Sequence, residues 1–334
     1  MRRPGWAVLA GCALALAGCP KKKSSGKPKV AVSIFPLYDI TRRVAGDRIE
    51  VVLVLPAGRS EHGYDPTPKE IARMSGTSLG LAVGLDMDTW LENIIKSAGG
   101  GSTKIVHLGE RVETIAISME HVGEDAAEAA EEHHEGEEHH EGADGGAQPE
   151  HEGEHEEHHH GGEELGAPDP HFWLDPVRMQ KVTDEIAKEL TALAPKDQAY
   201  FEGNAATIKG KLADLDKVIA ERVRPWPKKT IVTFHGSMTY FTHRYGLKIA
   251  AVIEPFPGKE PTAKYITDVL TAIKSSGAAA LFSEPQLDRR PAEVIAKESG
   301  IPLYELDPVG GSDGRDSYEK LMLANLDALG KALQ

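Results

Sequence analysis

The sequence predicts an α/β protein in which one long helix joins two similar lobes. Short apolar stretches alternate with amphipathic helical stretches over residues 29–108, and the same alternation returns over residues 230–333. Between the two series, apolar residues recur at spacings of three, four or seven over residues 196–223, which indicates one long helix. Ligands of parallel α/β sheets bind beyond the carboxyl ends of the strands. We therefore expect a site in the cleft between the lobes.

The first series predicts a lobe over residues 29–195. Its strands are expected at 29–35, 49–55, 79–84 and 103–108, and its helices at 36–46, 67–75, 88–98 and 176–193. The second helix has the clearest start, because Thr67 is a suitable N-cap, Pro68 follows it, and Glu70 stands three residues after the cap. Asp175 is expected to cap the fourth helix.

The second series predicts a lobe over residues 225–334, after a linking helix at 196–224. Its strands are expected at 230–234, 247–253, 278–283 and 301–306. Its helices are expected at 262–277, 291–300 and 317–333, and the first two end at a glycine.

The first 28 residues have the character of an export signal and a tether. Arg2 and Arg3 precede an apolar stretch that is too short to span a bilayer, so residues 1–18 are expected to form a signal peptide. This stretch ends in "LAGC", which resembles a bacterial lipobox and predicts lipidation of Cys19. Residues 19–28 form a basic tether. The other cysteine, Cys12, lies within the signal, so the mature chain is expected to have neither a disulfide nor a thiolate metal site.

Residues 120–164 interrupt the alternation with an acidic, histidine-rich insert. The insert holds 18 aspartate and glutamate residues, 10 histidines and no lysine or arginine, whereas the whole chain has a net charge of −14. Its low apolar content predicts disorder, and its composition indicates affinity for cations. Nucleic-acid binding is not expected, because the only basic run is the tether. The candidate auxiliary ligands are His133, His134, His139, His140, His151, His155, His158, His159 and His160.

Four side chains just beyond predicted elements could form a metal site. His62, His171, His235 and Asp307 come from well-separated loops, and imidazole and carboxylate are ligands that Zn²⁺ accepts. Two histidines and a carboxylate could also hold Mn²⁺ or Fe²⁺, and the third histidine of this set favours Zn²⁺. His107 and His243 have no flanking residues that indicate a site, and we interpret them as ordinary loop or surface residues.

Several motifs resemble the metal-binding solute-binding proteins of bacterial ABC transporters, in their zinc branch (the cluster A-I or cluster 9 family). The similarity covers nearly all of residues 28–333. It is carried by "VAVSIFPLYDITRRVAGD", "GYDPTP", "HFWLDP", "AYFEGNAATI", "FHGSMTYFTHRYGL", "EPFPGKEPTA", "LFSEPQ" and "ELDPVGG". The resemblance implies a rigid linking helix, a metal between the lobes, and small rather than wide movements on binding.

The resemblance also implies the ligand set His62, His171, His235 and Asp307. Manganese-binding relatives carry glutamate at the third position, where this chain has His235. Gly236 stands where the family usually has aspartate, and Glu61 stands where proline is common. Because some zinc members use an acidic residue at the position of Glu61, the fourth ligand is Asp307, Glu61 or water, with Asp307 expected first.

The resulting hypothesis is an extracytoplasmic, lipid-anchored zinc-binding protein that delivers Zn²⁺ to an ABC permease. The protein is expected to be a monomer and not an enzyme. The insert is expected to collect zinc for the cleft or to sense it, and the alternative is a passive linker. The alternative functions are a manganese- or iron-binding member of the same family, a zinc hydrolase, and a storage or adhesion lipoprotein. The hydrolase is disfavoured because the sequence contains neither a Gly-rich phosphate loop nor a nucleophile motif.

Overall fold

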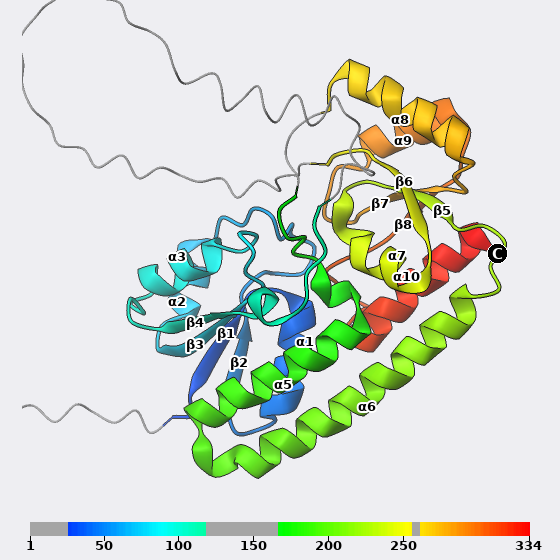
Figure 1. The fold of residues 1–334 in the computed structure, drawn as a ribbon. Helices are drawn as coiled ribbons and strands as arrows, with labels where there is room; N and C mark the ends of the chain where they lie inside the picture. The colour runs from blue at the N-terminus through cyan, green and yellow to red at the C-terminus, as the bar shows by residue number, and fades with distance from the viewer. Residues whose placement is uncertain (1–25, 118–165, 256–260) are drawn as a thin grey trace, which may run out of the picture.

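The computed structural model describes residues 26–117, 166–255 and 261–334, and contains two four-stranded parallel sheets (Figure 1). The first sheet has the strand order β2-β1-β3-β4 and the second has the matching order β6-β5-β7-β8. The strands are β1 (Lys29–Val32), β2 (Glu50–Leu53), β3 (Thr77–Ala82), β4 (Lys104–His107), β5 (Thr230–Thr233), β6 (Lys248–Val252), β7 (Leu281–Ser283) and β8 (Leu303–Glu305). All neighbouring strands are parallel, so their carboxyl ends share one edge of each sheet. The predicted two-lobed α/β fold is confirmed.

Helices connect and cover the two sheets. The helices around the first sheet are α1 (Phe35–Ala45), α2 (Pro68–Arg73), α3 (Trp90–Ser97) and α5 (Pro176–Leu193). Those around the second sheet are α7 (Thr239–Tyr245), α8 (Ala263–Ser276), α9 (Arg290–Ser299) and α10 (Tyr318–Leu333). Each of them except α7 was predicted from the sequence. Segments 1–25 and 118–165, which include the expected signal, most of the tether and the histidine-rich insert, lie outside the described residues.

The start of α2 is fixed by the expected capping box. The Thr67 hydroxyl accepts a hydrogen bond from the Glu70 amide, and the Glu70 carboxylate accepts one from the Thr67 amide at 2.8 Å. This box anchors the end of the long connection between β2 and α2. The other end is tied to the sheet, since the Val54 and Leu55 amides donate to the carbonyls of the last residue of β1 and of the residue after it.

The long helix α6 (Gln198–Val223) runs along one side of both lobes (Figure 1). Its 26 residues span about 39 Å at about 1.5 Å per residue, which is enough to reach from one lobe to the other. The helix packs on α1 and α5 of the first lobe and on α7 and α10 of the second. Its buried side chains are Phe201, Ala205, Ile208, Leu212, Leu215, Ile219 and Val223.

One hydrophobic core is continuous through both lobes. Buried side chains of the first lobe, such as Leu37 and Trp173, belong to the same cluster as Ile231, Phe282 and Tyr318 of the second. A smaller cluster lies in the second lobe alone, where residues on or beside strands β5, β6 and β7 pack against α8 and α9. Because protein cores are close-packed, a shared core resists rotation of one lobe against the other.

Hydrogen bonds from buried aromatic side chains join the lobes near the cleft. The Tyr240 hydroxyl donates to the Asp169 carbonyl oxygen at 2.7 Å, and the Trp173 indole N–H donates to the Pro308 carbonyl oxygen at 2.8 Å. The Tyr318 hydroxyl donates in turn to the Trp173 carbonyl oxygen at 2.6 Å. Each bond satisfies a buried polar group of one lobe with a partner from the other, so separating the lobes would leave several such groups unpaired.

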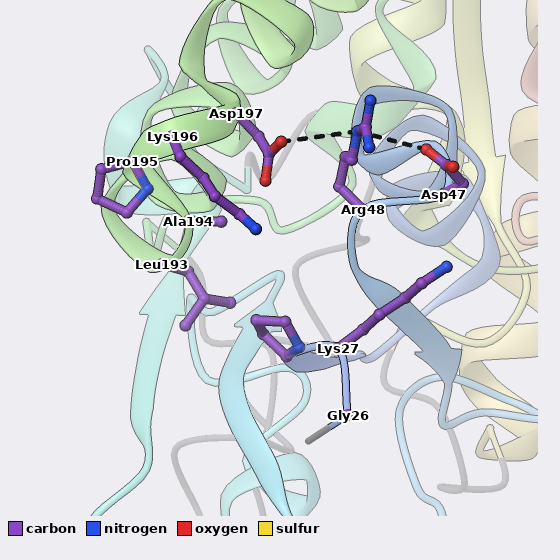
Figure 2. A pocket seen from close by; sticks show the side chains of 10 residues that line it. Gly26, Lys27, Asp47, Arg48, Leu193, Ala194, Pro195, Lys196 and Asp197 are labelled. Atoms are coloured by element: carbon purple, nitrogen blue, oxygen red, sulfur yellow. Dashed lines mark ion pairs between the residues drawn. The ribbon is translucent and has the colours of Figure 1, made fainter. Parts of the chain in front are cut away.

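A surface pocket of about 610 Å³ lies at the amino ends of the strands of the first sheet, away from the edge that holds their carboxyl ends (Figure 2). It is lined by residues that precede β1 and β2 and by the turn between α5 and α6. Lys27 and Lys196 contribute positive charge, while the Arg48 guanidinium lies between the carboxylates of Asp47 and Asp197 at 3.5 and 3.6 Å. The mixed charge and the position at the amino ends of the strands separate this pocket from the candidate ligands.

Candidate metal centre

Four candidate ligands lie together where loops of the two lobes meet. Glu61 and His62 lie on the β2–α2 loop, and His171 precedes the short turn that leads into α5. His235 comes two residues after β5, at the carboxyl edge of the second sheet. One donor atom from each of these four residues lies within 4.8 Å of all the others.

The three imidazoles direct the same ring nitrogen toward one point. The Nε2 atom of His62 lies 3.2 Å from that of His235 and 3.3 Å from that of His171, and the remaining pair is 3.2 Å apart. A tetrahedral Zn²⁺ with bonds of about 2.0 Å separates its ligand nitrogens by about 3.3 Å. The spacing of the three nitrogens therefore fits one zinc ion.

Glu61 supplies a carboxylate to this cluster. Its side chain is buried, and Oε1 has no hydrogen-bond partner among the described residues while lying 4.0 Å from His62 Nε2. Burial raises the pKa of Glu61 to about 7, against the opposing effect of His235 and with a smaller contribution from Glu284. Burying a carboxylate with an unsatisfied oxygen is costly unless a cation accompanies it. A divalent metal among the four donors would supply that charge.

The electrostatics of His62 also suit a metal ligand. Burial lowers the pKa of His62 well below its ordinary value, and the neighbouring His235 and His171 lower it further. The imidazole is therefore neutral at physiological pH, which is the form that coordinates a metal. Its side chain is 11% exposed, whereas those of His171 and His235 are each 1% exposed, so the metal would be reached from the His62 side.

A second layer of polar groups contacts the cluster. Asp169 Oδ1 lies 2.9 Å from His171 Nδ1, and Glu284 Oε1 lies 2.6 Å from His235 Nδ1. The Trp90 indole N–H donates to the Glu61 carbonyl oxygen at 3.0 Å. Sequence reasoning did not assign these three residues. Of the motifs quoted above, only "LFSEPQ" contains one of these three residues, Glu284.

Asp307, which was expected first as the fourth ligand, is not part of the cluster. One carboxylate oxygen accepts from Gln286 Nε2 at 2.7 Å and from the Gly310 amide at 2.8 Å, and the other accepts from Arg315 Nη1 at 2.9 Å. These donors already satisfy the carboxylate and hold it in the turn after β8. Glu61, which was the alternative, takes the place near the histidines.

The remaining sequence candidates do not join this site. His107 lies at the end of β4, where its Nε2 is 3.1 Å from Glu92 on α3. His243 lies on α7 and is also absent from the cluster. Cys19 and the histidines of the insert lie outside the described residues.

The fold and the cluster together define a class of protein, the two-lobed α/β metal-binding proteins with a buried site between the lobes. Comparison with known families makes the assignment specific. Residues 30–332 match the family described as zinc-uptake complex component A, periplasmic, and the chain belongs to this family.

Curated relatives carry the names of different metals. The zinc-binding lipoprotein AdcA of Streptococcus pneumoniae (strain ATCC BAA-255 / R6) is 30% identical over 95% of this chain, which spans only 58% of that relative's length. The high-affinity zinc uptake system protein ZnuA of Bacillus subtilis (strain 168) is 28% identical over 98% of this chain and 97% of its own length. The manganese ABC transporter substrate-binding lipoprotein PsaA of Streptococcus pneumoniae is 29% identical over 98% of this chain and 96% of its own length.

Solved structures share the fold. A crystal structure of ZnuA superposes with a TM-score of 0.71, covering 92% of this chain and 100% of that one, at 22% sequence identity. The similarity confirms the two-lobed architecture.

Proposed function

We propose that this protein captures Zn²⁺ outside the cytoplasm and delivers it to an ABC permease in the membrane. The observation that carries the proposal is the buried convergence of three imidazole Nε2 atoms on one point beside the Glu61 carboxylate, whose Oε1 has no hydrogen-bond partner among the described residues. Family membership and the names of the zinc-binding relatives support the transport role.

The proposed ligands are Glu61, His62, His171 and His235. Three nitrogens and one carboxylate oxygen are the number and kind of ligands that a closed tetrahedral Zn²⁺ site takes, whereas Mn²⁺ and Fe²⁺ suit sites richer in oxygen. The manganese-named relatives make the metal the point to test. Asp307 is not among the proposed ligands, because its carboxylate accepts hydrogen bonds from Arg315 and Gln286.

The same four proposed ligands argue against a zinc-dependent hydrolase. A catalytic zinc needs an open position for water, and here a carboxylate would fill the fourth position. The relatives are named as binding and transport proteins rather than enzymes. We therefore propose binding and delivery, and neither catalysis nor storage, as the role of the site.

Membrane attachment is proposed through lipidation of Cys19. Within the described residues, no helix is both long enough and apolar enough to cross a membrane. The names of several relatives include "lipoprotein", which supports an anchored, extracytoplasmic protein. We further propose that the insert at residues 120–164 collects zinc for the cleft and that the protein acts as a monomer.

A competitive zinc titration tests the proposal. We expect the chain 20–334 without residues 121–163 to bind one zinc tightly, and His235→Ala in this background to abolish or greatly weaken that binding. His243→Ala is the matched control, because His243 lies on α7 outside the cluster. The absence of tight zinc binding without the insert would overturn the proposal, since the insert itself would then be the site. Preferential binding of Mn²⁺ in competition would overturn the choice of metal.

A further inference from the structure

The carboxylate of Glu284 lies behind one of the proposed ligands. The residue follows β7, which is the neighbour of β5 in the second sheet. The register pairs Val232 with Leu281 and Thr233 with Phe282, so two further residues along each strand bring His235 opposite Glu284. The sheet itself therefore sets this carboxylate beside the ligand.

The contact is short and buried. Glu284 Oε1 lies 2.6 Å from His235 Nδ1, and the two side chains are 4% and 1% exposed. The same oxygen accepts a hydrogen bond from the Ser237 hydroxyl at 3.0 Å. The ion pairs of the described residues include no lysine or arginine partner for Glu284, so the carboxylate does not serve an ordinary salt bridge. Burying such a group is costly, and its closest contact is the proposed metal ligand.

We infer that Glu284 is a positioning residue for zinc binding, acting through His235. A neutral imidazole carries one N–H, and a carboxylate at Nδ1 keeps that hydrogen on Nδ1. Nε2 then presents its lone pair to the point where the three histidines converge. Carboxylate contacts of this kind fix the ring orientation and increase the basicity of the ligand nitrogen. The inference rests on the proposed function, since it assumes that the cluster binds zinc.

The three histidines then differ in how firmly they are held. Asp169 contacts Nδ1 of His171 as Glu284 contacts Nδ1 of His235. Within the described residues, no such carboxylate contacts Nδ1 of His62, which lies on a connecting loop and is the most exposed of the three. The rings of His171 and His235 are thus held in place before metal binding. The loop that carries Glu61 and His62 supplies the remaining ligands.

The experiment compares zinc affinity in the full mature chain with that of Glu284→Ala, Glu284→Gln and a control. We expect Glu284→Ala to weaken zinc binding by about 10- to 100-fold, the usual effect of removing such an outer partner. Glu284→Gln should lose less, because it keeps an acceptor oxygen beside Nδ1. Glu293→Gln on α9 is the control, since Glu293 is 57% exposed and pairs with Arg289. The d–d spectrum of bound Co²⁺ should change in Glu284→Ala and not in the control.

The outcomes separate the two proposals. If the unmodified chain binds no zinc, the proposed function fails. If it binds zinc and Glu284→Ala binds within twofold of it, the positioning role is refuted. Nitrogen-15 NMR of the zinc-loaded unmodified chain gives a test that does not depend on the stability of a variant. We expect a hydrogen on Nδ1 of His235, and a hydrogen on Nε2 instead would overturn the inference.

Discussion

Replacing Glu61 by glutamine should stabilise the metal-free protein while weakening zinc binding. Glu61 is 1% exposed, its Oε1 has no hydrogen-bond partner among the described residues, and burial raises its pKa from 4.5 to about 7. A raised pKa means that the folded chain disfavours the ionised form. Glutamine has nearly the same shape and carries no charge, so it removes this penalty together with a ligand.

The magnitude follows from the two pKa values. The folded state retains a proton that the unfolded state releases, so stability falls as pH rises from 4.5 through 7 and is constant above that range. Ionisation of Glu61 therefore lowers the free energy of unfolding by about 3 kcal/mol at pH 8 and by about 1 kcal/mol at pH 5. Glu61→Gln should therefore raise the free energy of unfolding by up to about 3 kcal/mol at pH 8 and by much less at pH 5.

Urea unfolding in the presence of a chelator measures this difference at both pH values. A zinc titration of the same variant should show weaker binding than that of the unmodified chain. Glu221→Gln is a suitable control, because Glu221 is exposed on α6 and should show neither effect. An equal change in stability at pH 5 and pH 8, or unchanged zinc affinity, would refute the assignment. Glu61 would then not be a buried ligand whose charge the metal neutralises.

Two further predictions concern the framework that holds the lobes together. Leu212→Ala, at a fully buried position on α6, should destabilise the chain by about 2–5 kcal/mol in urea unfolding, because it leaves a cavity in the core. The zinc affinity of this variant should stay within twofold of that of the unmodified chain. A large loss of affinity would contradict the separation of core and site. Asp216→Asn should destabilise the chain at pH 7 and progressively less as pH falls. Burial of Asp216 acts to raise its pKa, but hydrogen bonds from Arg244 and Tyr245 outweigh it and lower the pKa. The stabilisation is therefore present above the usual aspartate pKa and is lost as pH falls through the lower folded value. Thermal melts from pH 7 to pH 3 check this, and a constant difference would refute it.

Most of the fold could be predicted because its signals are local. Alternating strands and helices, the capping box at Thr67 and the apolar period of α6 are all readable in short windows of sequence. Helix α7 was not predicted, since its 7 residues include aromatic and β-branched side chains of low helix propensity. Its formation depends on tertiary packing, in which Tyr240 and Phe241 are buried in the shared core.

The candidate site was predicted in part for a related reason. Three histidines could be found because each follows a predicted strand or precedes a capped helix. The choice between Glu61 and Asp307 depends on Arg315 and Gln286, which reach Asp307 from separate segments of the second lobe. The pairing of Glu284 with His235 depends on the register between β5 and β7. Sequence spacing alone does not give contacts that are set by strand register or by a distant donor.

The continuous core also has a consequence for how the molecule unfolds. Two lobes with separate cores would melt in two steps, and a metal between them would stabilise only their docking. Here buried residues of both sheets belong to one cluster, so loss of packing in one lobe removes contacts of the other. We expect a single cooperative transition in which zinc at the cleft, a site that only the folded chain forms, raises the midpoint of the whole protein as its free concentration rises. Thermal denaturation would then serve as a global measure of occupancy at one small site.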